Sequence, residues 1–113
     1  MSFEQRTHGD VTILDLTPAI VTDVSKELFQ LTIESLVASG RTQVLLNLSD
    51  LRWMNSYALG LLVAAHRAVE DQGGRMALVG ANERVSEMLK VVGLSQVWNV
   101  YADESTALAS FGG

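Results

Sequence analysis

Short, almost fully apolar runs alternate with longer segments of helical periodicity from residue 44 onward. The clearest runs are residues 44–48 (Val-Leu-Leu-Asn-Leu) and residues 76–79 (Met-Ala-Leu-Val). Neither shows the alternation of a half-buried strand, so both predict strands that are buried on both faces of a sheet. Because strands separated by helices need crossover connections, this order favours a mostly parallel sheet with helices packed on it.

Three helices are predicted around these strands. The first ends at Gly40, the second spans residues 56–72, and the third ends at Gly93, where a glycine suits the position after a helix C-terminus. The candidate N-caps of the first helix are polar residues with short side chains: Thr22, Asp23 and Ser25. An apolar stripe along each helix predicts packing against the sheet.

The two ends of the chain complete the pattern. Residues 3–7 and 11–16 flank a His8-Gly9-Asp10 turn, which predicts a β-hairpin. A last strand is expected over residues 97–101 and a last helix over residues 103–111. We therefore predict a single α/β domain over residues 1–113, with a mixed, mostly parallel sheet in the order β-β-α-β-α-β-α-β-α.

Composition excludes several classes of function. The 113 residues hold no cysteine, which excludes thiol catalysis and zinc thiolate sites. The net charge of −5 and the scattered Lys and Arg residues argue against a nucleic-acid partner. Charged residues among the first ten positions leave no room for a signal peptide, and the longest apolar run is far shorter than a membrane span. We expect a cytoplasmic protein without a membrane span.

Enzyme signatures are missing from the chain. Neither the Gly-x-Ser-x-Gly elbow of hydrolases nor a phosphate-binding P-loop occurs. His8 and His66 have no metal-ligand partners at a suitable spacing, and His66 lies on the apolar register of its helix, which predicts a partly buried structural histidine. We therefore predict no catalytic residue, no cofactor and no metal.

One segment concentrates the functional signal. A buried strand, a loop and the start of a helix follow one another over residues 47–62, with Ser56 at the helix N-terminus. A serine there most often caps the free N–H groups of the first turn. The same position suits a phosphate, because those N–H groups and the helix dipole stabilise a negative charge.

This segment resembles the signature of the STAS domain, particularly that of bacterial anti-sigma factor antagonists. In that family, Asp-Ser-Ser/Thr-Gly-Leu-Gly begins a helix, and residues 55–60 of this chain read Asn-Ser-Tyr-Ala-Leu-Gly. Further landmarks are Gln72-Gly73-Gly74 and Val92-Gly93-Leu94, so that the resemblance covers nearly the whole chain.

The resemblance implies a partner-switching function. In the family, the unphosphorylated antagonist binds an anti-sigma factor that is also a serine protein kinase, and the phosphorylated product no longer binds. The phosphoacceptor corresponds to Ser56 in this chain, and a phosphatase is a further implied partner. The predicted partner-binding residues surround it: Trp53, Met54, Asn55, Ser56, Tyr57 and Ala58.

The chain departs from the family pattern around Ser56. Asn55 replaces the acidic residue of the motif, Tyr57 replaces a small hydroxyl residue, and Ala58 replaces glycine. Val21 stands where many antagonists carry an acidic residue. Leu59 and Gly60 follow the motif and are interpreted as structural: the residue at 59 in the core and the glycine at a site of close packing.

Two alternatives remain open from the sequence. One is a non-phosphorylated STAS scaffold or accessory subunit of a signalling or transport complex, which the changes at Asn55, Tyr57 and Ala58 would suit. The other is a binder of a small molecule or nucleotide that uses the loop at residues 80–82 and the neighbouring helix N-termini.

Overall fold

The computed structural model describes residues 3–18 and 26–112. Its five strands form one sheet in the order β1-β2-β3-β4-β5. β1 and β2 are antiparallel, and the other neighbouring pairs are parallel. The strands are β1 (Phe3–His8), β2 (Val11–Leu16), β3 (Gln43–Asn47), β4 (Arg75–Val79) and β5 (Val100–Tyr101). The predicted mixed sheet with an antiparallel edge is confirmed.

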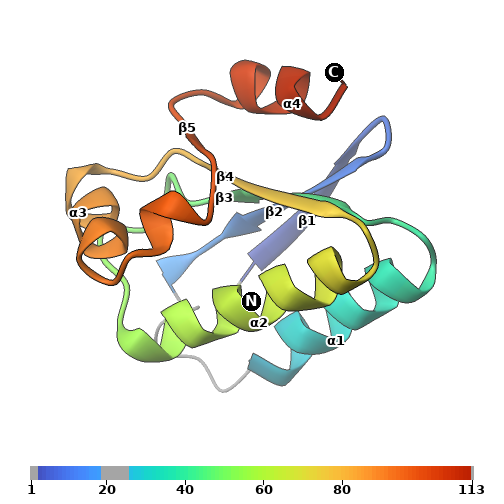
Figure 1. The fold of residues 1–113 in the computed structure, drawn as a ribbon, viewed down its shortest axis with the longest axis horizontal. Helices are drawn as coiled ribbons and strands as arrows, with labels where there is room; N and C mark the ends of the chain where they lie inside the picture. Colours follow the sequence, from blue (N-terminus) through green and yellow to red (C-terminus); the bar gives the residue numbers. More distant parts are fainter. Residues whose placement is uncertain (1–2, 19–25, 113) are drawn as a thin grey trace.

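Helices cover both faces of this sheet. They are α1 (Lys26–Ala38), α2 (Ser56–Asp71), α3 (Glu83–Val91) and α4 (Glu104–Gly112), with a short 3-10 helix η2 (Leu94–Gln96). Figure 1 shows α1 and α2 side by side below the sheet and α4 above it. The candidate caps Thr22, Asp23 and Ser25, and also Val21, lie outside the described residues.

Two buried clusters lie on the two faces of the sheet. Leu14, Leu46 and Leu78 are fully buried in the larger cluster, which α1, α2 and α3 cover. The neighbouring positions Leu45 and Ala77 are equally buried in the smaller cluster, beneath α4. Successive residues of β3 and β4 thus enter opposite cores, which explains why their sequences are almost continuously apolar.

The last strand is shorter than predicted. Only Val100–Tyr101 pairs with β4, whereas a strand was expected over residues 97–101. The backbone N–H groups of Val97 and Trp98 donate to Leu94 O at 3.0 and 3.1 Å, so this segment turns instead of extending. The apolar pattern there reflects burial of Trp98, which is 3% exposed, and this burial needs no strand.

Two of the expectations for α2 are met. The helix ends at Asp71, one residue before the predicted end, and Gly73 follows with a φ of +74°. His66 is the partly buried structural histidine that the pattern predicts, because its ring packs edge-on against Trp98 at 5.8 Å and its Nε2 contacts the Glu70 carboxylate.

Arg6 links three elements on the α4 side of the sheet. Its Nε donates to Asp15 Oδ2 of β2 at 2.6 Å, and its Nη2 donates to Glu104 Oε1 of α4 at 2.5 Å. These hydrogen bonds from the guanidinium lower the pKa of both carboxyl groups below their ordinary values. The N-terminus of α4 is thereby joined to the hairpin.

This cluster predicts a loss of stability in acid. A carboxyl group with a lowered pKa in the folded state contributes stability above its unfolded pKa and loses it as the pH falls through the folded pKa. We expect Arg6→Gln to lower the free energy of unfolding by about 0.5–1 kcal/mol near neutral pH, since the groups are partly exposed. The difference from wild type should disappear as the pH falls well below 3.8, the ordinary pKa of Asp15. Urea unfolding at several pH values measures it, and a difference that persists in acid would contradict the role given to these carboxylates.

Candidate functional site

Buried apolar side chains anchor the loop between β3 and α2, residues 48–55, to the core. Leu51 and Met54 are each 2% exposed and lie in the larger core, whereas Trp53 between them is 44% exposed. The loop therefore has a buried underside and presents a large aromatic ring on its surface.

Asn55 caps α2, which corrects the expectation that Ser56 does so. The Asn55 backbone is extended, and its side chain Oδ1 accepts a hydrogen bond from Ala58 N at 2.8 Å. Ser56 is the first residue inside the helix. Asparagine caps about as well as aspartate, so the replacement of the acidic motif residue keeps this hydrogen bond and removes a negative charge.

Ser56 is exposed in the first turn of α2. Unpaired N–H groups and the positive end of the helix dipole favour a negative charge at this position. The first turn carries no acidic side chain that would already compensate that field. A phosphate on the Ser56 hydroxyl would therefore be electrostatically favoured by the helix that carries it.

Five of the six predicted partner-binding residues divide into two groups, and the sixth, Asn55, is half-buried at the cap of α2. Trp53, Ser56 and Tyr57 are exposed, and we call these three residues the contact patch. Met54 and Ala58 are 2% and 0% exposed, so their side chains belong to the core. This burial corrects the expectation that both offer contact surface, because Met54 lies on the buried underside of the loop and Ala58 on the core-facing side of α2.

Leu59 is buried as predicted, but the interpretation of Gly60 was wrong. Gly60 is exposed, and a Cβ built on it would meet no atom of the described residues within 4 Å. No close packing requires a glycine there. Because Gly60 lies four residues after Ser56, the two positions are neighbours on one face of α2.

Polar contacts hold the beginning of the β3–α2 loop. Asn47 Nδ2 donates to Asp15 Oδ1 at 2.7 Å, and Asn47 Oδ1 accepts from both the backbone N–H and the hydroxyl of Ser49. Gly80, at the end of β4, lies so close to Ser49 that a Cβ on it would come within 2.2 Å of the hydroxyl oxygen. Gly80 is therefore packed against this loop, whereas Asn82 is exposed and lines a surface groove together with Trp53 and Met54.

Asn82, which the sequence suggests only as part of a binding loop at residues 80–82, joins the β3–α2 loop to α3. Its Oδ1 accepts from Val85 N at 2.8 Å and caps α3. Its Nδ2 donates to Leu51 O at 3.1 Å and to Arg52 O at 3.2 Å. An asparagine before a helix signals a cap, but no sequence pattern signals bonds to residues 30 positions away.

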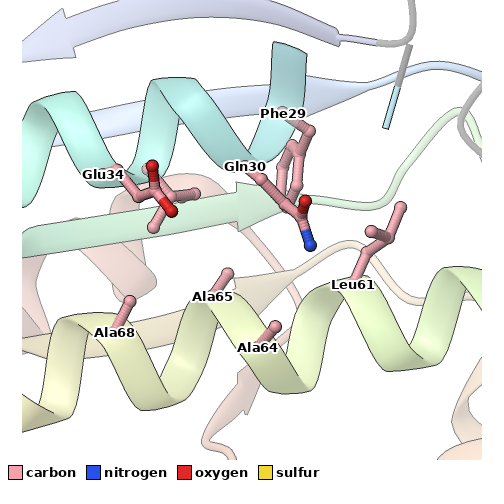
Figure 2. A pocket seen from close by; sticks show the side chains of 8 residues that line it. Phe29, Gln30, Glu34, Leu61, Ala64, Ala65 and Ala68 are labelled. Carbon is pink, nitrogen blue, oxygen red and sulfur yellow. The ribbon is translucent and has the colours of Figure 1, made fainter. Parts of the chain in front are cut away.

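A small cavity lies between α1 and α2. Figure 2 shows alanines of α2, Ala64, Ala65 and Ala68, facing Phe29 and Glu34 of α1 across it. Its volume is about 140 Å³. Sites for small molecules usually occupy roughly 300–1,000 Å³, so this space is a gap left by short side chains.

Within residues 3–18 and 26–112, no three His, Asp or Glu side chains come together as a candidate metal site. None of the helices described in the structure is both long enough and apolar enough to cross a membrane.

The fold and the site define a small α/β domain with an exposed serine at the start of a capped helix, beside exposed aromatic residues. The family profile described as STAS domain matches residues 2–107. The chain belongs to the STAS domain family.

Relatives and solved structures agree with this assignment. A Thermotoga neapolitana protein named as a candidate anti-sigma factor antagonist is 38% identical over 69 residues, which is 61% of this chain and 61% of that protein. The anti-sigma F factor antagonist of Paenibacillus polymyxa is 31% identical over 65 residues, covering 58% of this chain. The chain thus matches 56–61% of the length of these two relatives.

Two solved structures share the fold. The crystal structure of a candidate anti-sigma factor antagonist from Thermotoga maritima has a TM-score of 0.85 at 24% identity and covers 98% of this chain and 95% of its own. The Bacillus cell fate determinant SpoIIAA in its phosphorylated form has a TM-score of 0.73 at 21% identity, with 96% and 97% covered.

Proposed function

We propose that the chain is a cytoplasmic single-domain antagonist that binds an anti-sigma factor with serine kinase activity and is released when Ser56 is phosphorylated. The observation that carries the proposal is the exposure of Ser56 in the first turn of α2, beside Trp53 and Tyr57. A solved relative in a phosphorylated form supports it. A phosphatase that removes the phosphate would complete the cycle.

The contact patch suggests how phosphorylation releases the partner. Trp53 and Tyr57 are 44% and 42% exposed, and large aromatic rings of this kind often anchor protein interfaces. A phosphate on Ser56 adds about 1.5–2 negative charges within the same patch. A partner surface that fits the neutral patch would then have to desolvate this charge or meet it with its own acidic groups, and either outcome weakens binding.

The experiment that tests this function is intact-mass measurement after incubation with candidate kinases and ATP. We expect wild type to gain one phosphate and Ser56→Ala to gain none, because Ser56 lies where a phosphate is stabilised by the helix N-terminus. Ser105→Ala is the matched control, since Ser105 is also an exposed serine in the first turn of a helix, α4. That variant should be phosphorylated like wild type.

Binding of the same kinase to both forms tests the release step. We expect phosphorylated wild type to bind at least tenfold more weakly than the unmodified protein. If a kinase binds tightly but adds no phosphate to Ser56, the chain is instead a constitutive STAS scaffold or accessory subunit. The uncharged Asn55 at the cap of α2 is the observation that favours this second function.

A further inference from the structure

We propose that Asn82 is a positioning residue of this site: its side-chain amide ties the backbone of the β3–α2 loop to the N-terminus of α3 and so holds Trp53 in place. The inference rests on the proposed function, because it assigns a role to Asn82 in presenting the contact patch. It concerns a residue that belongs to neither the patch nor the motif around Ser56.

The two ends of the Asn82 amide have separate tasks. The oxygen accepts from Val85 N at 2.8 Å and caps α3, as the Asn55 oxygen does for α2. The nitrogen donates to two consecutive loop carbonyls, Leu51 O and Arg52 O. A serine or an aspartate could supply the cap, but only an amide combines a capping oxygen with an NH₂ group that has two donor hydrogens.

The position of Trp53 depends on the hydrogen bonds from Asn82 because the backbone of the loop, and not packing of the ring, holds this residue. The side chains of Leu51 and Met54 are buried, but the Trp53 ring is 44% exposed and gains less from packing. Its direction is therefore set by the peptide units just before it, which include both carbonyl groups that Asn82 binds. Loss of the two bonds would leave the core anchors in place and let the outer part of the loop move.

The loop and α3 also share a surface groove. Trp53 and Met54 line it from the loop, and Met88 and Val91 line it from α3, with Asn82 at the junction. In Figure 1, α3 and the loop that leads into α2 lie at the same end of the sheet. The hydrogen bonds of Asn82 thus fix the distance between Trp53 of the contact patch and α3, a helix that lies outside the motif around Ser56.

Two substitutions of Asn82 remove the hydrogen bonds from its Nδ2 to the loop and keep the cap of α3. Asn82→Asp keeps a capping oxygen, adds a charge that the helix dipole favours, and places carboxylate oxygens opposite the two loop carbonyls. Asn82→Ser keeps a capping oxygen without the charge and is too short to copy the amide. Asn99→Asp, at an exposed asparagine beyond α3, controls for the added charge.

The readout is the quenching of tryptophan fluorescence by acrylamide, which needs no partner. Trp98 is 3% exposed and contributes little quenching, so the signal reports on Trp53. We expect the quenching constant to rise about twofold in Asn82→Asp and Asn82→Ser and to stay at the wild-type value in Asn99→Asp. Circular dichroism should show that the helices of all variants are retained.

The second measurement is the rate of phosphorylation by the kinase that modifies wild-type Ser56. We expect the KM for both Asn82 variants to rise about tenfold with little change in kcat, because Trp53 is displaced while the Ser56 hydroxyl stays in place. Unchanged quenching in both variants would show that Asn82 only caps α3. Raised quenching with an unchanged KM would equally refute the positioning role. If wild-type Ser56 is not modified by any kinase, the proposed function fails, and quenching still decides whether Asn82 holds the loop.

Discussion

Replacing Gly74 with alanine is expected to lower the free energy of unfolding by about 2–4 kcal/mol, the largest loss of stability that we predict for a single added methyl group. A Cβ at Gly74 would lie 2.1 Å from Thr42 O and 2.5 Å from Thr42 Cβ. The clash is with backbone that cannot move freely, because Arg75 N donates to that same carbonyl oxygen at 2.8 Å. Equilibrium unfolding in urea, followed by circular dichroism, measures the loss.

Gly73→Ala is the matched control for this substitution. Gly73 has a φ of +74°, which disfavours alanine, but a Cβ there meets nothing within 4 Å. We expect a loss of about 1 kcal/mol from the backbone conformation alone. If the Gly74 variant is no less stable than the Gly73 variant, the α2–β4 turn does not pack against Thr42 as tightly as the structure shows.

The sequence predicts the central part of the fold because burial there leaves a clear pattern. Leu45 and Leu46 enter opposite cores, and this arrangement requires the uninterrupted apolar run that predicts a buried strand. The same reasoning fails at the last strand. Trp98 is buried from a turn after η2, and its apolar neighbours resemble a strand without forming one.

The sequence predicts where in the chain the site lies, but it does not predict which side chains contact one another there. The position of Ser56 at a helix start follows from periodicity, but Asn55 and Ser56 are both good capping residues and only the structure shows which one caps. The burial of Met54 depends on the path of an irregular loop, and the sequence of such a loop has no periodicity from which burial can be predicted. The bonds from Asn82 to the loop depend on how two parallel strands align, and local sequence carries no record of them.

Gly60→Ala is expected to raise the free energy of unfolding by about 1 kcal/mol. Glycine in a helix interior costs roughly this much relative to alanine, and a methyl group at Gly60 meets no atom within 4 Å. Ala64→Gly is the reverse control one turn further along α2, at another exposed position, and should lower stability by a similar amount. Urea unfolding of both variants tests the pair.

The same Gly60→Ala substitution should weaken binding of the proposed anti-sigma partner by about 5- to 100-fold, although it stabilises the protein. Nothing in the packing of residues 3–18 and 26–112 explains a glycine that costs stability at this position, whereas a bare backbone beside Ser56 lets a partner approach the helix closely. A methyl group inserted into a close contact typically costs about 1–3 kcal/mol, and 1.4 kcal/mol corresponds to a factor of ten in affinity. Calorimetric titration of the partner with Gly60→Ala and Ala64→Gly measures the effect, and equal affinities of both variants and wild type would place the contact surface away from this face of α2.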